Sequence, residues 1–138
     1  VKLKQSYKMN TPNCSCGSPN SYSNCCEIAH VNILQVDTAE ALMRSRYTAF
    51  TMHNGDYLIN THHSSTRFKV NKLELENWSK SVTWIKLEVL ETKMGGENDN
   101  EGTVYFKAHF IEKGKKQYIE ENSLFNKEFG EWKYVGYA

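Results

Sequence analysis

The sequence predicts an α+β protein in which helices pack on one face of a curved, mostly antiparallel four-stranded sheet. Apolar residues recur at helical spacing between residues 38 and 50, whereas from Val82 onward they alternate with a period of two. All four cysteines lie between Cys14 and Cys26, in a segment too polar to form a core of its own. We therefore expect helices first, strands afterwards, and a small N-terminal unit that depends on its cysteines.

The composition narrows the class of protein. With 138 residues and a net charge of +1, the chain has the size of one domain and lacks the strongly basic balance typical of nucleic-acid binding. No apolar run approaches the roughly 18 residues of a membrane-spanning helix, and residues 1–10 lack the apolar core of a signal peptide. We expect a cytoplasmic protein without a membrane partner, with a flexible N-terminal extension over residues 1–13.

The cysteines form two closely spaced pairs, Cys14 with Cys16 and Cys25 with Cys26. Four thiolates can close a tetrahedral shell around Zn²⁺, and clustered cysteines in a reducing compartment are more often metal ligands than disulfides. We therefore predict one structural Zn²⁺ ion bound by these four residues, with a backbone that curls at Cys25 and Cys26 as in the first turn of a helix. An ion saturated by four thiolates has no open position for water, which argues against metal catalysis.

Other roles stay open for this segment. The cysteines could form a disulfide or a redox-active pair, or remain free structural thiols. His30 could replace one thiolate or be a surface residue. Tyr22 could cover the site or pack on the neighbouring domain, and Gly17 is suited to the positive φ that turns backbone amides toward sulfur.

Residues 38–50 are predicted to form an amphipathic helix with Asp37 as its N-cap. Arg46 falls on the apolar stripe of this helix, so its guanidinium needs a carboxylate or carbonyl partner inside the fold. It could brace the helix to the sheet or belong to an anion-binding pocket. The other members of the stripe are Ala39, Leu42, Met43, Tyr47 and Phe50.

A shorter helix is expected after Asn54-Gly55, with His62 and His63 near its end. Histidine is the side chain suited to acid–base chemistry at neutral pH, although one near a helix C-terminus often serves as a polar cap. His63 is therefore a candidate catalytic residue, with the cap as its alternative. A further helical segment around residues 75–81 carries Trp78 and leads into the sheet.

In the predicted strands, the alternation of apolar and polar residues indicates which side chains share a face. A polar loop is expected at residues 95–100. In the first strand, Trp84 is expected on the face opposite Leu87. In the third strand, Glu121 shares a face with apolar residues, which is unusual for a carboxylate. If the helices cover that face, Glu121 is the natural partner for Arg46, and an ion pair would account for both charges.

Several motifs resemble known families. Cys14-Ser-Cys-Gly-Ser18, Tyr22 and Cys25-Cys26 resemble the SEC-C motif, a zinc-binding module also found at the C-terminus of the translocase ATPase SecA. Residues 38–50 are similar to the first helix of the YchJ-like family of uncharacterised bacterial proteins, with further matches at residues 61–66, 101–104, 121–125 and 132–135. The resemblance implies a SEC-C-like zinc knuckle over residues 14–30. It also implies a nuclear-transport-factor-two-like domain, with a cystatin-like cone shape, over residues 36–138.

Two classes of function follow from this resemblance. The first is a binding or adaptor protein whose structural zinc knuckle adds stability and docks on ribosome- or translocation-associated partners. The second is a small-molecule site in the cone, either for binding alone or for a lyase, isomerase or hydrolase reaction. Arg46, His63 and Glu121 are the candidate residues for that site, and an accessible pocket lined by all three would favour it.

Overall fold

The computed structural model describes residues 12–138, so most of the extension predicted over residues 1–13 lies outside the described residues. The helices are α2 (Cys26–Val31), α3 (Ala39–Thr51), α4 (Gly55–Asn60) and α5 (Lys72–Ser81), and short 3₁₀ turns form η1 (Tyr22–Asn24), η2 (Ile33–Gln35) and η3 (Arg67–Lys69). The strands are β1 (Thr83–Met94), β2 (Glu101–Glu112), β3 (Lys115–Glu128) and β4 (Glu131–Tyr137). Within this range, every helix is too short or too polar to cross a membrane.

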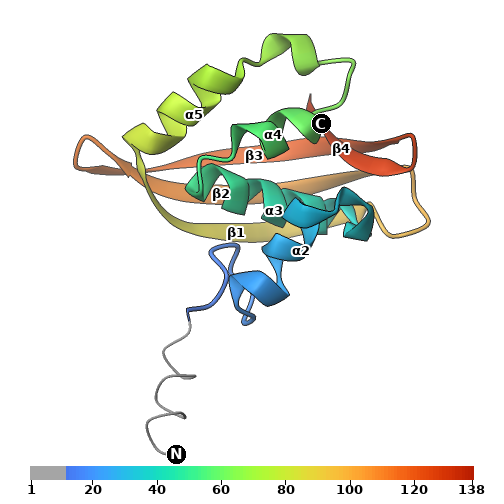
Figure 1. Cartoon of the computed structure of the whole chain (residues 1–138), viewed down its shortest axis with the longest axis horizontal. Coiled ribbons are helices and arrows are strands. Elements are labelled where there is room, and N and C mark those ends of the chain that lie inside the picture. Colours follow the sequence, from blue (N-terminus) through green and yellow to red (C-terminus); the bar gives the residue numbers. More distant parts are fainter. Residues whose placement is uncertain (1–11) are drawn as a thin grey trace, which may run out of the picture.

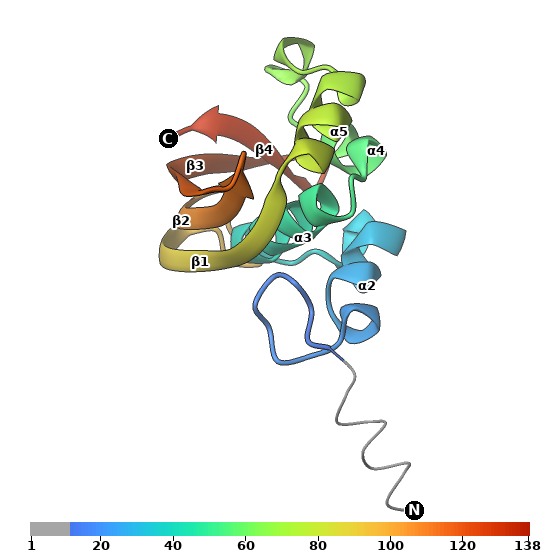
Figure 2. The same ribbon diagram turned by 90° about the vertical axis from the view of Figure 1, so that its left-hand side faces the viewer.

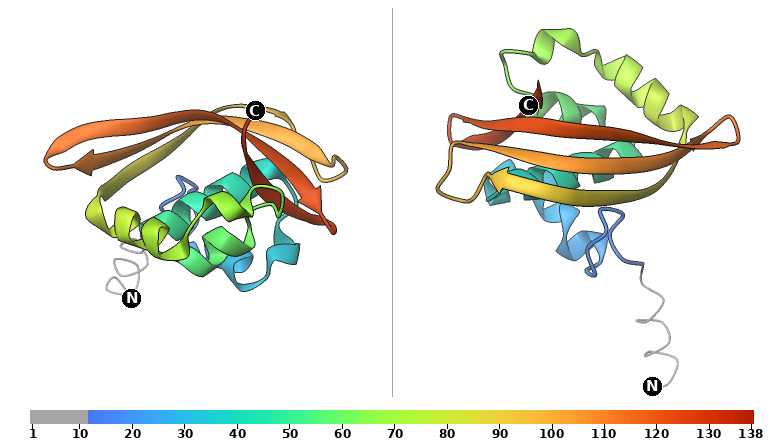
Figure 3. Two further views of the ribbon diagram at one scale, coloured as in Figure 1. Left: turned by 90° about the horizontal axis from the view of Figure 1, so that it is seen from above. Right: turned by 180° about the vertical axis from the view of Figure 1, so that it is seen from behind.

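The four strands form one sheet in the order β1-β2-β3-β4, and each neighbouring pair is antiparallel. The sheet is strongly curved, and α3, α4 and α5 all lie on one of its faces (Figures 1 and 2). Viewed from above, the strands arch over these helices (Figure 3), whereas α2 packs on α3. The predicted α+β class and the antiparallel four-stranded sheet are confirmed.

Helix α3 forms the centre of the core, as its apolar stripe predicts. Leu42 is fully buried and Tyr47 is 2% exposed, while Phe50 at the far end is only partly buried. The predicted N-cap is wrong by one residue, because Thr38 rather than Asp37 caps the helix, with its Oγ1 accepting a hydrogen bond from the Ala41 amide.

Strand β1 departs from simple alternation. Its pairing with β2 shifts register between Trp84 and Lys86, which inserts one extra residue into the strand. Trp84 therefore pairs with Phe110 and Leu87 with Ala108, so that both side chains pack with the core. The prediction that Trp84 and Leu87 lie on opposite faces is wrong, because a β-bulge changes the side-chain register within one strand.

The polar loop between β1 and β2 closes the N-terminal end of α3. Gly95 has φ +80°, and its carbonyl accepts a hydrogen bond from the Ala39 amide at 2.9 Å. A side chain at this position would meet the Ala39 Cβ at 2.8 Å, so only glycine fits without a shift.

The C-terminal end of α4 is attached to β4. The amide of Tyr134 donates to the Thr61 carbonyl at 2.8 Å, and the amide of His63 donates to the Tyr134 carbonyl at 2.8 Å. His62 lies opposite Tyr134 in this short parallel bridge. The bridge holds the Tyr134 ring over the concave face of the sheet, beside α3.

Candidate metal centre and candidate ligand pocket

The four cysteines are brought together into one cluster, which we call the four-cysteine cluster (Cys14, Cys16, Cys25 and Cys26). Their sulfur atoms all lie within 4.8 Å of one another, and three of the residues are buried. All four are free thiols, and the Sγ atoms of Cys16 and Cys25 are 3.6 Å apart, too far for a disulfide. A tetrahedral zinc–thiolate site places its sulfurs about 3.8 Å apart, so the donor set fits such an ion.

Local backbone geometry produces this convergence. Gly17 has φ +95°, and its amide donates to the Cys14 carbonyl at 3.1 Å, which turns the chain back beneath the first pair. Cys25 has φ −140° and ψ −107°, and Cys26 is the first residue of α2. The predicted curl at Cys25 and Cys26 and the positive φ of Gly17 are both confirmed.

The cluster is attached to helix α3. Thr48 donates from its Oγ1 to the Cys26 Sγ at 3.3 Å, and the same hydroxyl lies 3.7 Å from the Cys14 Sγ. Arg44 donates from Nη1 to the Cys16 carbonyl at 2.6 Å. The segment is therefore packed on the domain and anchored by side chains of one helix.

His30 strengthens this attachment and does not belong to the cluster. Its Nδ1 lies 2.8 Å from the Tyr22 hydroxyl and its Nε2 lies 2.8 Å from the Ser45 carbonyl, so both ring nitrogens are engaged. Its ring also packs on Tyr57, with centroids 4.5 Å apart. His30 is therefore neither a surface residue nor a replacement for one thiolate, so both expectations for it are wrong. Tyr22 packs against the cysteines.

The cysteine thiols of the cluster differ in pKa. The pKa of Cys16 is lowered to about 4, chiefly because it accepts a hydrogen bond from Cys26. The pKa of Cys26 is raised because its thiol donates the hydrogen bond to Cys16 and because it is buried. A metal ion that takes all four sulfurs as thiolates would release such protons, which makes metal affinity depend on pH.

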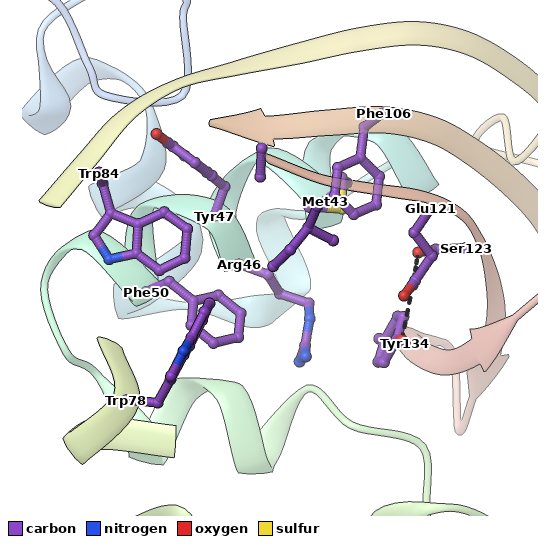
Figure 4. A pocket seen from close by; sticks show the side chains of 12 residues that line it. Met43, Arg46, Tyr47, Phe50, Trp78, Trp84, Phe106, Glu121, Ser123 and Tyr134 are labelled. Atoms are coloured by element: carbon purple, nitrogen blue, oxygen red, sulfur yellow. Dashed lines mark hydrogen bonds between the residues drawn. The ribbon is translucent and has the colours of Figure 1, made fainter. Parts of the chain in front are cut away.

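A second feature is a pocket between α3, α5 and the sheet, with a volume of about 140 Å³ (Figure 4). Its lining consists of an aromatic wall and a polar end, with Phe106 beside Glu121 where the two meet. The aromatic wall consists of Tyr47, Phe50, Trp78, Trp84 and Phe106, and the polar end consists of Arg46, Glu121, Ser123 and Tyr134.

Arg46 is the most deeply buried charged group of the polar end, at 6% exposed. Its Nη1 donates to the Leu58 carbonyl at 2.9 Å and to Thr61 Oγ1 at 2.7 Å, and its Cζ lies 4.7 Å from the centroid of the Tyr134 ring. Burial lowers the pKa of Arg46 to about 10, although nearby tyrosines and Glu121 oppose the shift.

Glu121 and Arg46 line the same pocket without a direct ion pair. The Oε2 of Glu121 accepts hydrogen bonds from the Tyr134 hydroxyl at 2.9 Å and from Ser123 Oγ. The Tyr134 ring stands between the guanidinium and the carboxylate, and burial raises the pKa of its hydroxyl. The predicted Arg46–Glu121 ion pair is therefore replaced by an indirect connection through Tyr134.

The aromatic wall is a set of edge-to-face contacts. The Trp78 and Trp84 rings lie 5.3 Å apart at 83°, and the Phe50 and Trp78 rings lie 6.3 Å apart at 85°. Sequence reasoning missed this wall because Trp84 was assigned to the opposite face of its strand. The helical spacing of Tyr47 and Phe50 was the available signal for the part that α3 contributes.

His63 lies away from this pocket, at the end of α4. Its Nδ1 is 2.8 Å from Ser65 Oγ and its Nε2 is 3.9 Å from Glu128. Of the three candidate residues, the structure thus brings Arg46 and Glu121 together and leaves His63 outside the pocket lining.

The fold and the cluster together define a class of protein, an α+β cone domain preceded by a cysteine cluster of SEC-C type. The chain belongs to the YchJ family, because the family model described as "YchJ, middle NTF2-like domain" matches residues 38–136. A UPF0225 protein of Vibrio vulnificus is 44% identical over 124 residues, covering 88% of this chain and 72% of the relative. A UPF0225 protein of Photorhabdus laumondii is 40% identical over 124 residues, covering 88% of this chain and 77% of that protein.

Two solved structures share the fold. The solution structure of a SEC-C motif containing protein from Rhodopseudomonas palustris has a TM-score of 0.78 and 32% identity, covering 90% of this chain and 95% of that one. The crystal structure of a SEC-C motif containing protein from Psychrobacter arcticus has a TM-score of 0.73 and 26% identity, covering 94% of this chain and 83% of that one. These similarities agree with the SEC-C assignment of the cysteine cluster.

Proposed function

We propose that this is a cytoplasmic zinc-stabilised binding protein, in which Cys14, Cys16, Cys25 and Cys26 hold one structural Zn²⁺ ion. The observation that carries the proposal is the convergence of four free sulfurs within 4.8 Å of one another. Zinc prefers a tetrahedral set of thiolates, and a site with four protein ligands leaves no position for a reacting water. The reducing cytoplasm keeps such thiols available for the metal. The ion fastens the residue 14–30 knuckle to α3.

Metal analysis of the purified protein tests this assignment. We expect one zinc per chain, and a loss of at least tenfold in zinc affinity for Cys25→Ser, because a hydroxyl is a poor replacement for a thiolate ligand. Ser21→Ala is the matched control, since Ser21 lies in the same loop and its side chain contacts only Ser23. A zinc affinity of Cys25→Ser equal to that of the unaltered protein, measured by chelator competition, would contradict the four-thiolate site.

Helix α2 and the turn η2, at the C-terminal end of the knuckle and just beyond it, also offer a surface for a protein partner. Ile28, Val31 and Leu34 are 48%, 80% and 66% exposed, and they follow one another along α2 and η2. Exposed apolar side chains close together are typical of interaction sites. With the SEC-C similarity, this surface supports an adaptor role toward ribosome- or translocation-associated proteins.

The adaptor role can be tested with purified ribosomes and with the purified translocase ATPase. We expect one of these to bind the zinc-loaded protein, and we expect Val31→Glu to abolish binding without loss of zinc. Lys80→Glu, on α5, is the control for a change of charge alone. Binding that survives Val31→Glu would exclude this surface.

A second candidate function is the binding of a small molecule in the pocket. The specific observation in its favour is Arg46, a 6% exposed guanidinium without a carboxylate partner within ion-pairing distance. Burying such a charge is unfavourable unless a partner compensates it, and unusual buried charges concentrate at functional sites. With His63 outside the lining, the pocket supports binding better than it supports a lyase, isomerase or hydrolase reaction.

A panel of small anions, cations, zwitterions and uncharged aromatic compounds tests the pocket, with thermal shift and calorimetry as readouts. We expect at least one compound to bind and to lose its binding in Ala108→Leu, because Ala108 lines the pocket and the larger side chain fills it. Val135→Leu on β4 is the control, since that residue does not line the pocket. A panel without a single binder would reject this candidate function.

A further inference from the structure

The polar end of the pocket holds donors and an acceptor that have no hydrogen-bond partner among the described residues. Both side-chain hydrogen bonds of Arg46 come from Nη1, which leaves the donors on Nε and Nη2. Likewise, both hydrogen bonds to Glu121 end on Oε2, which leaves Oε1. Arg46 and Glu121 both line the pocket, and within the described residues no sealed side-chain nitrogen or oxygen lacks a partner, so these unpaired atoms keep some exposed surface.

The charges of these two groups restrict what can bind. Arg46 contributes a positive charge and Glu121 a negative one, and the remaining lining residues are apolar, aromatic or hydroxyl-bearing. A simple carboxylate would satisfy Arg46 but lie near the negative Glu121, and a simple amine would lie near the positive Arg46. A zwitterion with its carboxylate at Arg46 and its ammonium group at Glu121 meets both charges with opposite ones.

Tyr134 places the two charged groups on either side of one aromatic ring. The guanidinium carbon of Arg46 lies 4.7 Å from the Tyr134 ring centroid, and the Tyr134 hydroxyl lies 2.9 Å from the Glu121 oxygen. The positive and the negative group therefore both lie at the polar end of the pocket.

The aromatic wall determines which kind of side chain the ligand can carry. Phe50, Trp78 and Trp84 form the side of the pocket that faces the polar end (Figure 4), and their contacts favour an apolar group. The volume of about 140 Å³ is close to that of engineered cavities that hold one benzene molecule, which have about 150 Å³. The side chain of the ligand is therefore no larger than one benzene ring, and a short branched aliphatic group meets that limit.

We propose that this pocket binds a small α-amino acid with a branched aliphatic side chain. Its carboxylate accepts hydrogen bonds from Nε and Nη2 of Arg46, its ammonium group donates to Oε1 of Glu121, and its side chain packs on Phe50, Trp78 and Trp84. The proposal rests on the second candidate function above and names the chemical class of its ligand.

Three probes of nearly equal shape test the proposal by calorimetry at pH 7 with the full, zinc-loaded chain. L-leucine carries both charges, 4-methylpentanoate lacks the ammonium group, and 3-methylbutylamine lacks the carboxylate. We expect leucine to bind with a Kd at least tenfold lower than either analogue. In Glu121→Gln, we expect the preference for leucine over 4-methylpentanoate to fall at least fivefold, because the negative partner of the ammonium group is gone.

The outcomes separate this inference from the candidate function on which it rests. If 4-methylpentanoate binds as tightly as leucine, the amino-acid assignment is overturned while a ligand pocket remains. If none of the three probes binds but another panel compound does, the assignment is again overturned and the pocket again remains. If no compound of any class binds, both fall. The ranking of the probes on the unaltered protein needs no variant, so it holds even if Glu121→Gln does not fold.

Discussion

Replacement of Arg46 by methionine separates a structural brace from a residue kept for binding. Methionine has a similar length and fills the same space, but it removes the charge and both hydrogen bonds from Nη1. If Arg46 mainly braces α3 against α4 and the sheet, its removal should destabilise the protein by about 3–5 kcal/mol, because two hydrogen bonds from a charged group are lost. If Arg46 is kept for a ligand, the loss should be much smaller.

Two opposing contributions decide the stability of Arg46→Met: the cost of burying the charge, which is removed, and a hydrogen bond, which is lost. Burial lowers the pKa of Arg46 from 12.5 to about 10, so the fold disfavours the charged form by about 3 kcal/mol, since one pKa unit is about 1.4 kcal/mol. Because the folded pKa is lowered, this penalty is fully present below pH 10 and disappears only as the pH rises toward 12.5. Removing the charge in Arg46→Met removes this penalty, which is a gain in stability. The substitution also takes away the hydrogen-bond partner of the Leu58 carbonyl, which costs about 1–3 kcal/mol.

We therefore expect Arg46→Met to be as stable as the native protein or up to about 2 kcal/mol more stable, because the gain of about 3 kcal/mol is offset by a loss of about 1–3 kcal/mol. Urea unfolding at pH 7, followed by tryptophan fluorescence, measures this difference. Arg46→Lys should be less stable than Arg46→Met, because the ammonium group is more strongly hydrated and lacks the planar fork of the guanidinium. A loss of more than about 3 kcal/mol in Arg46→Met would refute the argument and leave Arg46 as a brace.

Three further predictions concern other parts of the structure. Gly95→Ala should lower the free energy of unfolding by about 1–3 kcal/mol, because φ is +80° and the new Cβ meets Ala39 at 2.8 Å; an unchanged urea midpoint would contradict this. Thr48→Val should weaken zinc binding at least tenfold in a chelator competition, since the hydroxyl that donates to Cys26 is lost. His62 has a pKa lowered from 6.5 to about 4 by burial and by nearby positive charges. The unfolded chain therefore binds a proton first on acidification, and stability should fall between pH 6.5 and about 4, an effect that His62→Gln should reduce.

Local signals in the sequence were sufficient for most of the helices and strands and for the grouping of the four cysteines. The helical period of residues 38–50 identified α3, and the period of two after Val82 identified the sheet. The cysteines are close in the chain, so their convergence depends on a short backbone segment with one glycine and one helix start. Short-range geometry of this kind is encoded by nearby residues, which is why it could be read from the sequence.

Long-range contacts were harder to predict. The extra residue between Trp84 and Lys86 places Trp84 on the core face, and alternation alone cannot reveal where a bulge interrupts a strand. The placement of His30 also depends on a distant partner, the Ser45 carbonyl on α3. The inward direction of Arg46 was predicted correctly from the helical spacing, but its partners are a carbonyl, a hydroxyl and a ring in place of a carboxylate.

The two proposed sites share helix α3, so the proposed metal ion would have a role beyond the knuckle. Arg44 and Thr48 lie one turn apart and hold the four-cysteine cluster, while Arg46 and Phe50 lie one turn apart and line the pocket. Because the sites use different faces of one rigid helix, an ion that fixes the cysteines against α3 also fixes the helix that carries the guanidinium. A metal that performs no chemistry can in this way determine how well Arg46 is positioned for a ligand.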